Sequence, residues 1–263
     1  DTTEYTIIIN ALFVTKYIAN EEDLQNISVI ETALDGKGYY MLANNITMSG
    51  SSRTWFWYGD INHIIGYNHA FTGTIDGNGY RVTGFALEYA DVHGFINQFG
   101  EGGTLKNIAF VDMVLTNKGG FIANSTGGTL ENVYLGIKTF DNVDQNNHGL
   151  FGPTYTTNTF TMKNVVIDYT GAEINVDGKA NTTILGSFSG GSKFENVVVK
   201  GVPVAYKATD YEGKGLTNSD GSYKMYISYS DGTDNGTEMP VNGWNTEYWT
   251  VNTADKIITW KQK

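Results

Sequence analysis

The pentapeptide TLKNI, at residues 104–108, recurs three more times along the chain. It returns as TLENV at 129–133, TMKNV at 161–165 and KFENV at 193–197. In every copy the second and fifth residues are apolar, the fourth is Asn, and the third alternates between Lys and Glu. Successive Asn residues are 25, 32 and 32 positions apart. Periods of about 20 to 50 residues indicate a solenoid.

The composition of the repeat selects the kind of solenoid. The units are rich in Gly, Thr and Val and lack an apolar spacing of 3.6 residues, which excludes helical repeats. A propeller blade is longer, about 40 residues or more. A second landmark lies between the pentapeptides, as HGFI at 93–96, GGFI at 119–122, HGLF at 148–151 and LGSF at 185–188. The pattern predicts an all-β parallel β-helix, with coils stacked about 4.8 Å apart.

The repeated Asn has a structural explanation. Leu105 and Ile108 are both apolar but three positions apart, so strict strand alternation would place them on opposite faces. A left-handed residue between them would turn the chain and direct both inward, and Asn tolerates that conformation. Asn side chains stacked in one column can also hydrogen-bond from coil to coil. We therefore interpret this column as structural; its members are Asn107, Asn132, Asn164 and Asn196.

The residues that precede the Asn column form a second predicted column, on the outside of the stack. It contains Lys106, Glu131, Lys163 and Glu195, so the charge alternates from coil to coil. Neighbouring opposite charges attract, and a slip of one coil would set like charges against each other. The alternation is thus predicted to fix register rather than to bind a ligand.

Composition and charge exclude several classes of function. The 263 residues include 32 Gly, 3 Pro and no Cys, with a formal net charge of −11. Binding to nucleic acids and binding to anionic membrane surfaces both require clustered Lys and Arg, so the acidic balance argues against both. Without Cys there is no disulfide scaffold and no thiolate metal site. The apolar run near the start is too short to span a bilayer and is interrupted by Asn10 and Lys16, so we expect no membrane insertion and a monomer.

The two ends of the solenoid are expected to be covered. Residues 1–34 are predicted to form a strand and a capping helix, in which Asn20 is the N-cap and Leu24, Ile27 and Ile30 cover the first coil. Residues 35–205 would form the coils. Residues 206–263 are predicted to be a closing β region of the same domain, with four aromatic residues in the cap: Trp244, Tyr248, Trp249 and Trp260.

The segment GGFIANSTGGTLENVY, at 119–134, resembles the GLUG repeat of bacterial surface proteins, and HGLFG at 148–152 matches its first half. The resemblance extends over roughly 17–200, with departures at Ala123, where Gly is usual, and in the LGSFSGGSKF unit. It implies a right-handed parallel β-helix on a secreted or wall-attached bacterial protein with an adhesive or carbohydrate-related role. Because the motif is structural, it transfers no catalytic residues.

One stretch is a candidate ligand site. In SSRTWFWYGD, at 51–60, Trp55 and Trp57 alternate with Phe56 and Tyr58 beside Arg53. Exposed indole rings are a platform for sugar rings, so Arg53, Trp55, Trp57 and Tyr58 are the candidate carbohydrate-binding residues. The alternative, which we favour, is that these aromatic residues cover the end of the solenoid.

An enzyme is the less favoured reading. IDGNG at 75–79 resembles a turn of pectate lyases and polygalacturonases, but Asp76 is interpreted as a turn former beside Gly77. Glycosidases need two carboxyls at defined spacing, and acids do not stack in the column four residues past each Asn, which holds Val111, Gly136, Asp168 and Lys200. The sequence therefore favours a non-catalytic surface module for adhesion or ligand display, with glycans or proteins as partners. A polysaccharide-binding module and a carbohydrate-active enzyme remain the alternatives.

Metal sites have little support. His93 and His148 occupy equivalent positions about two rungs apart, too far to share a zinc ion, and His63 and His69 lack an acidic or Cys partner at ligand spacing. No cofactor is expected apart from calcium, for which Asp231 and Asp234 in SDGTDNG are the candidate ligands.

Overall fold

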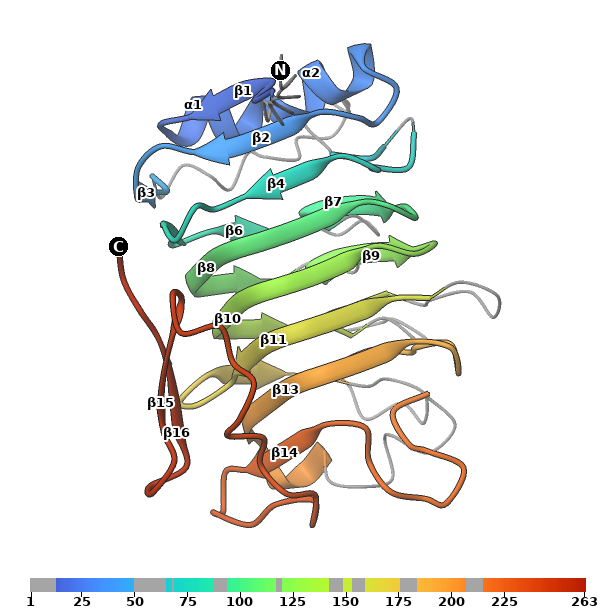
Figure 1. The fold of residues 1–263 in the computed structure, drawn as a ribbon, viewed down its shortest axis with the longest axis vertical. Coiled ribbons are helices and arrows are strands. Elements are labelled where there is room, and N and C mark those ends of the chain that lie inside the picture. Colours follow the sequence, from blue (N-terminus) through green and yellow to red (C-terminus); the bar gives the residue numbers. More distant parts are fainter. Residues whose placement is uncertain are drawn as a thin grey trace, which may run out of the picture.

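The chain folds into a stack of parallel strands, as the computed structural model shows (Figure 1). The structure describes residues 13–49, 65–67, 69–87, 94–116, 120–141, 149–152, 159–175, 184–206 and 215–263. The strands that succeed each other along the stack are β1 (Lys16–Ile18), β2 (Tyr39–Leu42), β4 (Thr74–Asp76), β8 (Thr104–Leu115), β10 (Thr129–Asp141), β11 (Thr161–Asp168), β13 (Lys193–Val202) and β14 (Tyr226–Tyr229). Every neighbouring pair is parallel, which confirms the predicted β-helix.

Shorter strands complete the coils. Four of them join the same 12-stranded sheet: β3 (Ile46–Thr47), β5 (Arg81–Thr83), β6 (Ala86–Leu87) and β12 (Glu173–Asn175). On the opposite wall β7 (Ile96–Phe99) pairs with β9 (Ile122–Ser125). The second landmark aligns there, since Ile96 pairs with Ile122 and Ile122 with Phe151. The fourth copy, LGSF, differs from the predicted alignment by two residues, because Phe151 bridges to Gly186 rather than to Phe188.

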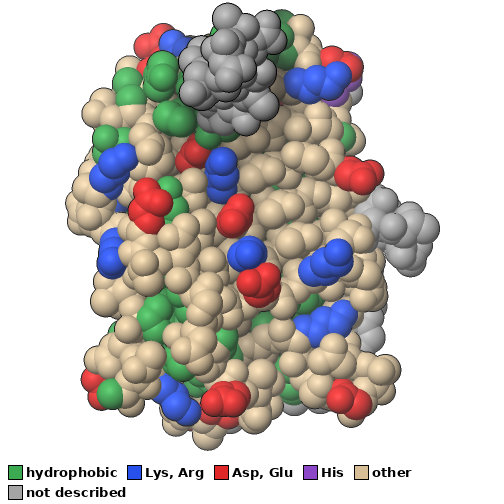
Figure 2. Space-filling model, viewed as in Figure 1, with side chains coloured by type: hydrophobic (Ala, Val, Ile, Leu, Met, Phe, Trp, Pro, Cys, Tyr) green, Lys and Arg blue, Asp and Glu red, His purple; other side chains and the backbone are tan. Residues whose placement is uncertain are grey.

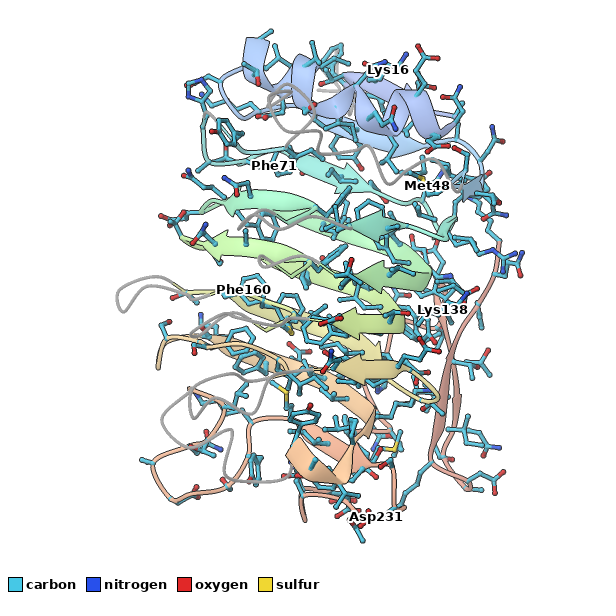
Figure 3. All side chains as sticks on the ribbon, turned by 180° about the vertical axis from the view of Figure 1, so that it is seen from behind. Lys16, Met48, Phe71, Lys138, Phe160 and Asp231 are labelled. Atoms are coloured by element: carbon cyan, nitrogen blue, oxygen red, sulfur yellow. The ribbon has the colours of Figure 1, made fainter. Side chains whose placement is uncertain are left out.

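The interior is closely filled with aromatic and aliphatic side chains (Figure 3). Leu105 and Ile108, on either side of Asn107, are both fully buried, as the Asn corner predicts. Phe95 and Phe121 stack on adjacent coils with their ring centroids 5.3 Å apart. Phe110 packs edge-on against Phe121 at 5.0 Å. Aromatic stacking thus repeats the period of the coils inside the core.

The first coil is covered by two short helices, α1 (Glu21–Gln25) and α2 (Ile27–Ala33), where the sequence predicts one. Asn20 is the N-cap, and its Oδ1 accepts a hydrogen bond from the Asp23 N–H at 2.9 Å. Leu24 and Ile27 are fully buried, and Ile30 is half-buried against the same core. The predicted N-terminal cap is therefore confirmed.

The last coil ends in a 3₁₀ turn, η3 (Val204–Tyr206), and the short strand β14. The outer edge of β14 is occupied by Asn235. Its Oδ1 accepts from the Ile227 N–H at 3.2 Å, and its Nδ2 donates to the Met225 carbonyl at 3.0 Å. A local side chain thus satisfies backbone groups that would otherwise offer an edge to another strand.

The remaining C-terminal residues form an antiparallel hairpin, β15 (Trp249–Asn252) and β16 (Ile257–Trp260), which runs along the side of the stack (Figure 1). Trp249 is 1% exposed and belongs to a small separate core with Val166 and Val198. The prediction that Trp244, Tyr248, Trp249 and Trp260 close the end is wrong in position. They cover outward-facing residues of the coils, of which Val166 and Val198 are apolar and buried beneath them.

Candidate functional site

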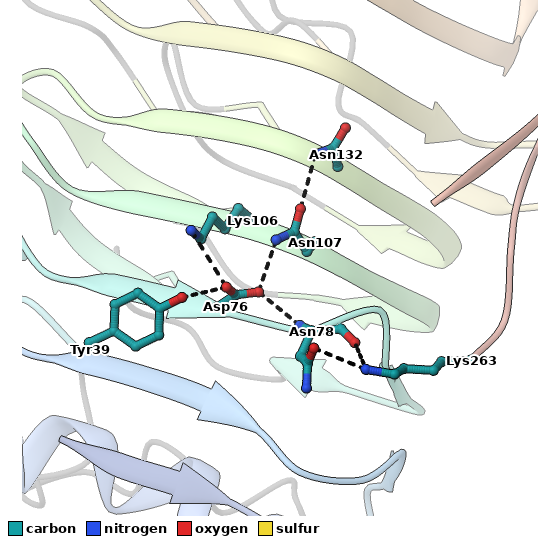
Figure 4. Close-up of polar contacts among 7 residues, drawn as sticks. All are labelled: Tyr39, Asp76, Asn78, Lys106, Asn107, Asn132 and Lys263. Atoms are coloured by element: carbon teal, nitrogen blue, oxygen red, sulfur yellow. Dashed lines mark hydrogen bonds and ion pairs between the residues drawn. The ribbon is translucent and has the colours of Figure 1, made fainter. Parts of the chain in front are cut away.

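The Asn column forms a continuous hydrogen-bonded ladder, and Figure 4 shows its first bond, between Asn132 and Asn107. Asn107, Asn132, Asn164 and Asn196 have φ between 53° and 54°, the left-handed conformation that the sequence predicts. Each Nδ2 donates to the Oδ1 of the preceding Asn, at 3.0 Å to Asn107, 3.1 Å to Asn132 and 3.0 Å to Asn164. The left-handed corners and the coil-to-coil hydrogen bonds that the sequence predicts are thus both present.

Asp76 ends this ladder, a role that turn formation alone does not describe. Its Oδ1 accepts from Asn107 Nδ2 at 3.0 Å and from the Asn78 N–H at 2.8 Å (Figure 4). Its Oδ2 accepts from the Tyr39 hydroxyl at 2.5 Å and lies 3.5 Å from Lys106 Nζ. Burial and the adjacent Asp76 carboxylate raise the pKa of Tyr39. Asp76 is thus a buried structural hub.

The charged column has the predicted register. Glu131 is opposite both Lys106 and Lys163, and Lys163 is opposite Glu195. Asp76 is opposite Lys106, so the alternation starts one coil earlier than predicted. Figure 2 shows the resulting line of alternating red and blue side chains along this face. Lys163 Nζ lies 3.4 Å from Glu195 Oε1.

Replacing Lys163 with Glu should lower the free energy of unfolding by about 1 kcal/mol, because three successive coils would then carry a carboxylate. Chemical denaturation at low and high salt would measure the loss. Salt should reduce it, since the pair is exposed to solvent. Lys193→Gln, which removes an exposed lysine of β13 outside the charged column, is the control. A loss of the same size in the control would contradict the role of the column.

A groove with a volume of 380 Å³ lies between β16 and the coils; we call it the lateral groove. Its charged and polar lining consists of Arg81, Tyr134, Asp168, Lys200, Thr259 and Gln262, and its apolar lining of Ala109, Val111, Ile258 and Trp260. Arg81 comes from β5, Tyr134 from β10, Asp168 from β11 and Lys200 from β13. The stacking of coils therefore brings together side chains that are more than 100 residues apart.

Asp168 is the centre of the polar cluster in the lateral groove. Its Oδ2 accepts from the Tyr134 hydroxyl at 3.0 Å and pairs with Lys200 Nζ at 2.9 Å. Its Oδ1 accepts from the Thr170 N–H at 3.0 Å. Burial raises the pKa of Asp168, but Lys200 and the Thr170 hydrogen bonds outweigh burial and hold the pKa below its usual value. Burial and the Asp168 carboxylate raise the pKa of Tyr134.

These shifts predict a pH-dependent contribution to stability. A carboxyl whose pKa is lowered by folding stabilises the protein above the unfolded-state pKa, about 3.9, and this contribution is lost as the pH falls through the folded-state pKa. Asp168→Asn should therefore cost about 1–2 kcal/mol near pH 7 and progressively less below pH 4. Parallel denaturant titrations of both proteins across this range would show it. A cost that stays constant down to pH 2 would contradict the assignment.

Other candidate residues from the sequence analysis lie either outside the described residues or in an exposed turn. Arg53, Trp55, Trp57 and Tyr58 lie outside the described residues, as do His63, His93 and His148. Asp231 and Asp234 lie in one exposed turn, where their Oδ1 atoms accept from the N–H groups of Thr233, at 3.0 Å, and Gly236, at 2.8 Å. Within the part of the chain that the structure describes, no three His, Asp or Glu residues are grouped as metal ligands would be.

By fold the chain is a parallel β-helix whose polar columns hold the coils in register. Neither the models of known protein families nor the solved structures give a match. Halomucin of the archaeon Haloquadratum walsbyi is 31% identical over 123 residues, which is 44% of this chain and 1% of halomucin. The chain thus spans a very small part of this distant relative, whose archaeal source does not support a bacterial origin. Within the described ranges no helix has the length and apolarity to cross a membrane.

Proposed function

We propose that this chain is a non-catalytic module of a cell-surface or extracellular protein, and that it serves adhesion or ligand display toward glycans or proteins. The observation that carries the proposal is the pairing of charged side chains along the coils. Asp76 pairs with Lys106, Lys163 with Glu195, and Asp168 with Lys200. A stack held in register in this way is a stiff support, and the distant similarity to halomucin and the resemblance to GLUG repeats agree with a surface location.

The absence of catalysis is part of the proposal. A glycosidase needs a general acid whose pKa is raised, beside a second carboxyl. In the lateral groove the one carboxyl, Asp168, has a lowered pKa, and its oxygens are occupied by Tyr134, Lys200 and Thr170. This environment favours the ionised form of the carboxyl, which accepts hydrogen bonds, over a proton donor.

The test uses the whole purified chain on immobilised neutral and acidic polysaccharides and on cell-wall preparations. Retention of the chain is measured together with new reducing ends and unsaturated uronate products in the same samples. We expect retention on at least one surface and no product. Product that accumulates in proportion to the chain would overturn the non-catalytic assignment, and absence of retention on every surface would overturn the adhesive one.

A further inference from the structure

We propose that the lateral groove binds a short anionic oligosaccharide that lies along the stack axis. This inference rests on the carbohydrate-related part of the proposed function and names the binding site and the ligand class. The groove is bounded on one side by β16 and on the other by successive coils. Arg81 is opposite Ala109, Ala109 opposite Tyr134, and the next coil carries Asp168. Three coil spacings separate the rung of Arg81 from that of Asp168, about 14 Å, so the groove is longer than one sugar ring.

The two ends of the lateral groove are rich in hydrogen-bond donors. An Arg guanidinium carries five N–H donors and a Lys ammonium three. Arg81 Nη1 donates to Gln262 Oε1 at 3.2 Å, and Lys200 Nζ pairs with Asp168 at 2.9 Å, which leaves further donors on both cations. The Asp168 oxygens already accept from Tyr134, Lys200 and Thr170. An occupant must therefore supply acceptors, and carboxylate or sulfate oxygens suit Arg and Lys best.

Part of the groove wall is apolar. Ala109, Val111 and Ile258 line it together with the half-buried indole of Trp260. Indole and aliphatic surface suits the C–H faces of sugar rings, whereas a simple inorganic anion would gain nothing from it. Acceptor groups together with apolar ring faces describe an acidic sugar chain.

The net charge of the chain does not oppose this ligand at the groove itself. The chain carries −11 overall, but the lining contains two cations, Arg81 and Lys200, and one carboxylate, Asp168. Carboxylates farther than about 8 Å are largely screened at physiological salt, whereas groups in direct contact are screened much less. Binding should consequently weaken as salt rises.

The experiment measures the affinity of the whole chain for three probes by calorimetry: an oligogalacturonate, dextran sulfate and neutral dextran. Arg81→Gln and Lys200→Gln each remove one cation from the groove. Lys193→Gln removes an exposed cation from the same strand as Lys200 but outside the groove, and is the matched control. Because Lys200→Gln leaves Asp168 without its ion pair, the double variant Asp168→Asn/Lys200→Gln restores a neutral pair and separates binding from folding.

We expect binding to at least one acidic probe and not to dextran. Each groove variant, and the double variant, should bind the acidic probe about 10- to 100-fold more weakly, because each loses a charge-assisted hydrogen bond to the ligand. Lys193→Gln should bind like the wild type. Preference for oligogalacturonate would identify a carboxylated ligand, and preference for dextran sulfate a sulfated one. The proposal that the lateral groove binds an anionic oligosaccharide would be overturned by any of three results: equal binding of dextran, unchanged affinity of the groove variants, or no binding of either acidic probe. Retention on other surfaces would then still support the adhesive module, whereas turnover of a bound probe would overturn only the non-catalytic assignment.

Discussion

Replacing Asn164 with alanine should lower the free energy of unfolding by about 3–5 kcal/mol. Asn164 is 3% exposed and lies inside the ladder, where it donates to Asn132 and accepts from Asn196. Alanine leaves both partner groups without a hydrogen bond, at about 1–3 kcal/mol each when buried. Alanine also tolerates the left-handed conformation at φ 54° less well than Asn, whose short polar side chain can hydrogen-bond locally, and this difference adds about 1 kcal/mol. Denaturant unfolding monitored by tryptophan fluorescence would measure the loss.

Asn164→Gly separates the two causes. Glycine adopts the left-handed conformation without penalty, so this variant loses the ladder bonds but not the backbone fit. It should therefore be more stable than Asn164→Ala by about 1 kcal/mol. Asn175→Ala, an exposed position on β12, controls for the removal of an amide side chain. Equal losses in the alanine and glycine variants would show that the left-handed corner contributes nothing measurable.

The ladder also explains why the sequence predicts the coils so well. A coil corner needs a residue that tolerates positive φ, and a stacked column needs an amide that both donates and accepts. Only Asn meets both requirements, so the four ladder positions carry the same residue. This recurrence makes the repeat period of the coils visible in the sequence. One coil earlier the corresponding strand, β4, runs into Gly77, and a Cβ there would lie 2.4 Å from the Asn107 carbonyl oxygen. The ladder therefore ends on the Asp76 carboxylate, which the repeat pattern does not identify.

The lateral groove could not be predicted in the same way, because it depends on where the hairpin packs. Tryptophans at the C-terminus are equally suited to cover an end or a side of the stack. The signal that distinguishes the two lies in the coils. The residue two positions after each ladder Asn should face outward, yet this column is apolar or aromatic throughout: Ala109, Tyr134, Val166 and Val198. Outward-facing apolar side chains must be shielded from water by another element that packs on the side of the stack, and strands β15 and β16 do this.

Truncation after Val241 should convert the chain into an aggregating protein, because it removes the hairpin and exposes Val166 and Val198. Both valines are at most 1% exposed in the intact chain, and Trp249 packs against them. Removing a buried Trp side chain alone typically costs about 3–5 kcal/mol, and the truncation removes Trp244 and Trp260 as well. Light scattering, size-exclusion chromatography and hydrophobic-dye binding would record the change. Trp249→Ala in the full chain should show a milder form of the same defect.

A second truncated protein determines which surface the hairpin protects. Truncation after Val241 leaves β14 and Asn235 in place, so the end of the stack keeps its own cover. Val166→Thr and Val198→Thr, introduced into the truncated chain, keep the β-branched shape but make the exposed face polar. They should restore soluble monomer in large part, since the apolar column drives the association. If these substitutions have no effect on aggregation, the hairpin acts on the end of the stack after all, as its tryptophans suggest from sequence alone.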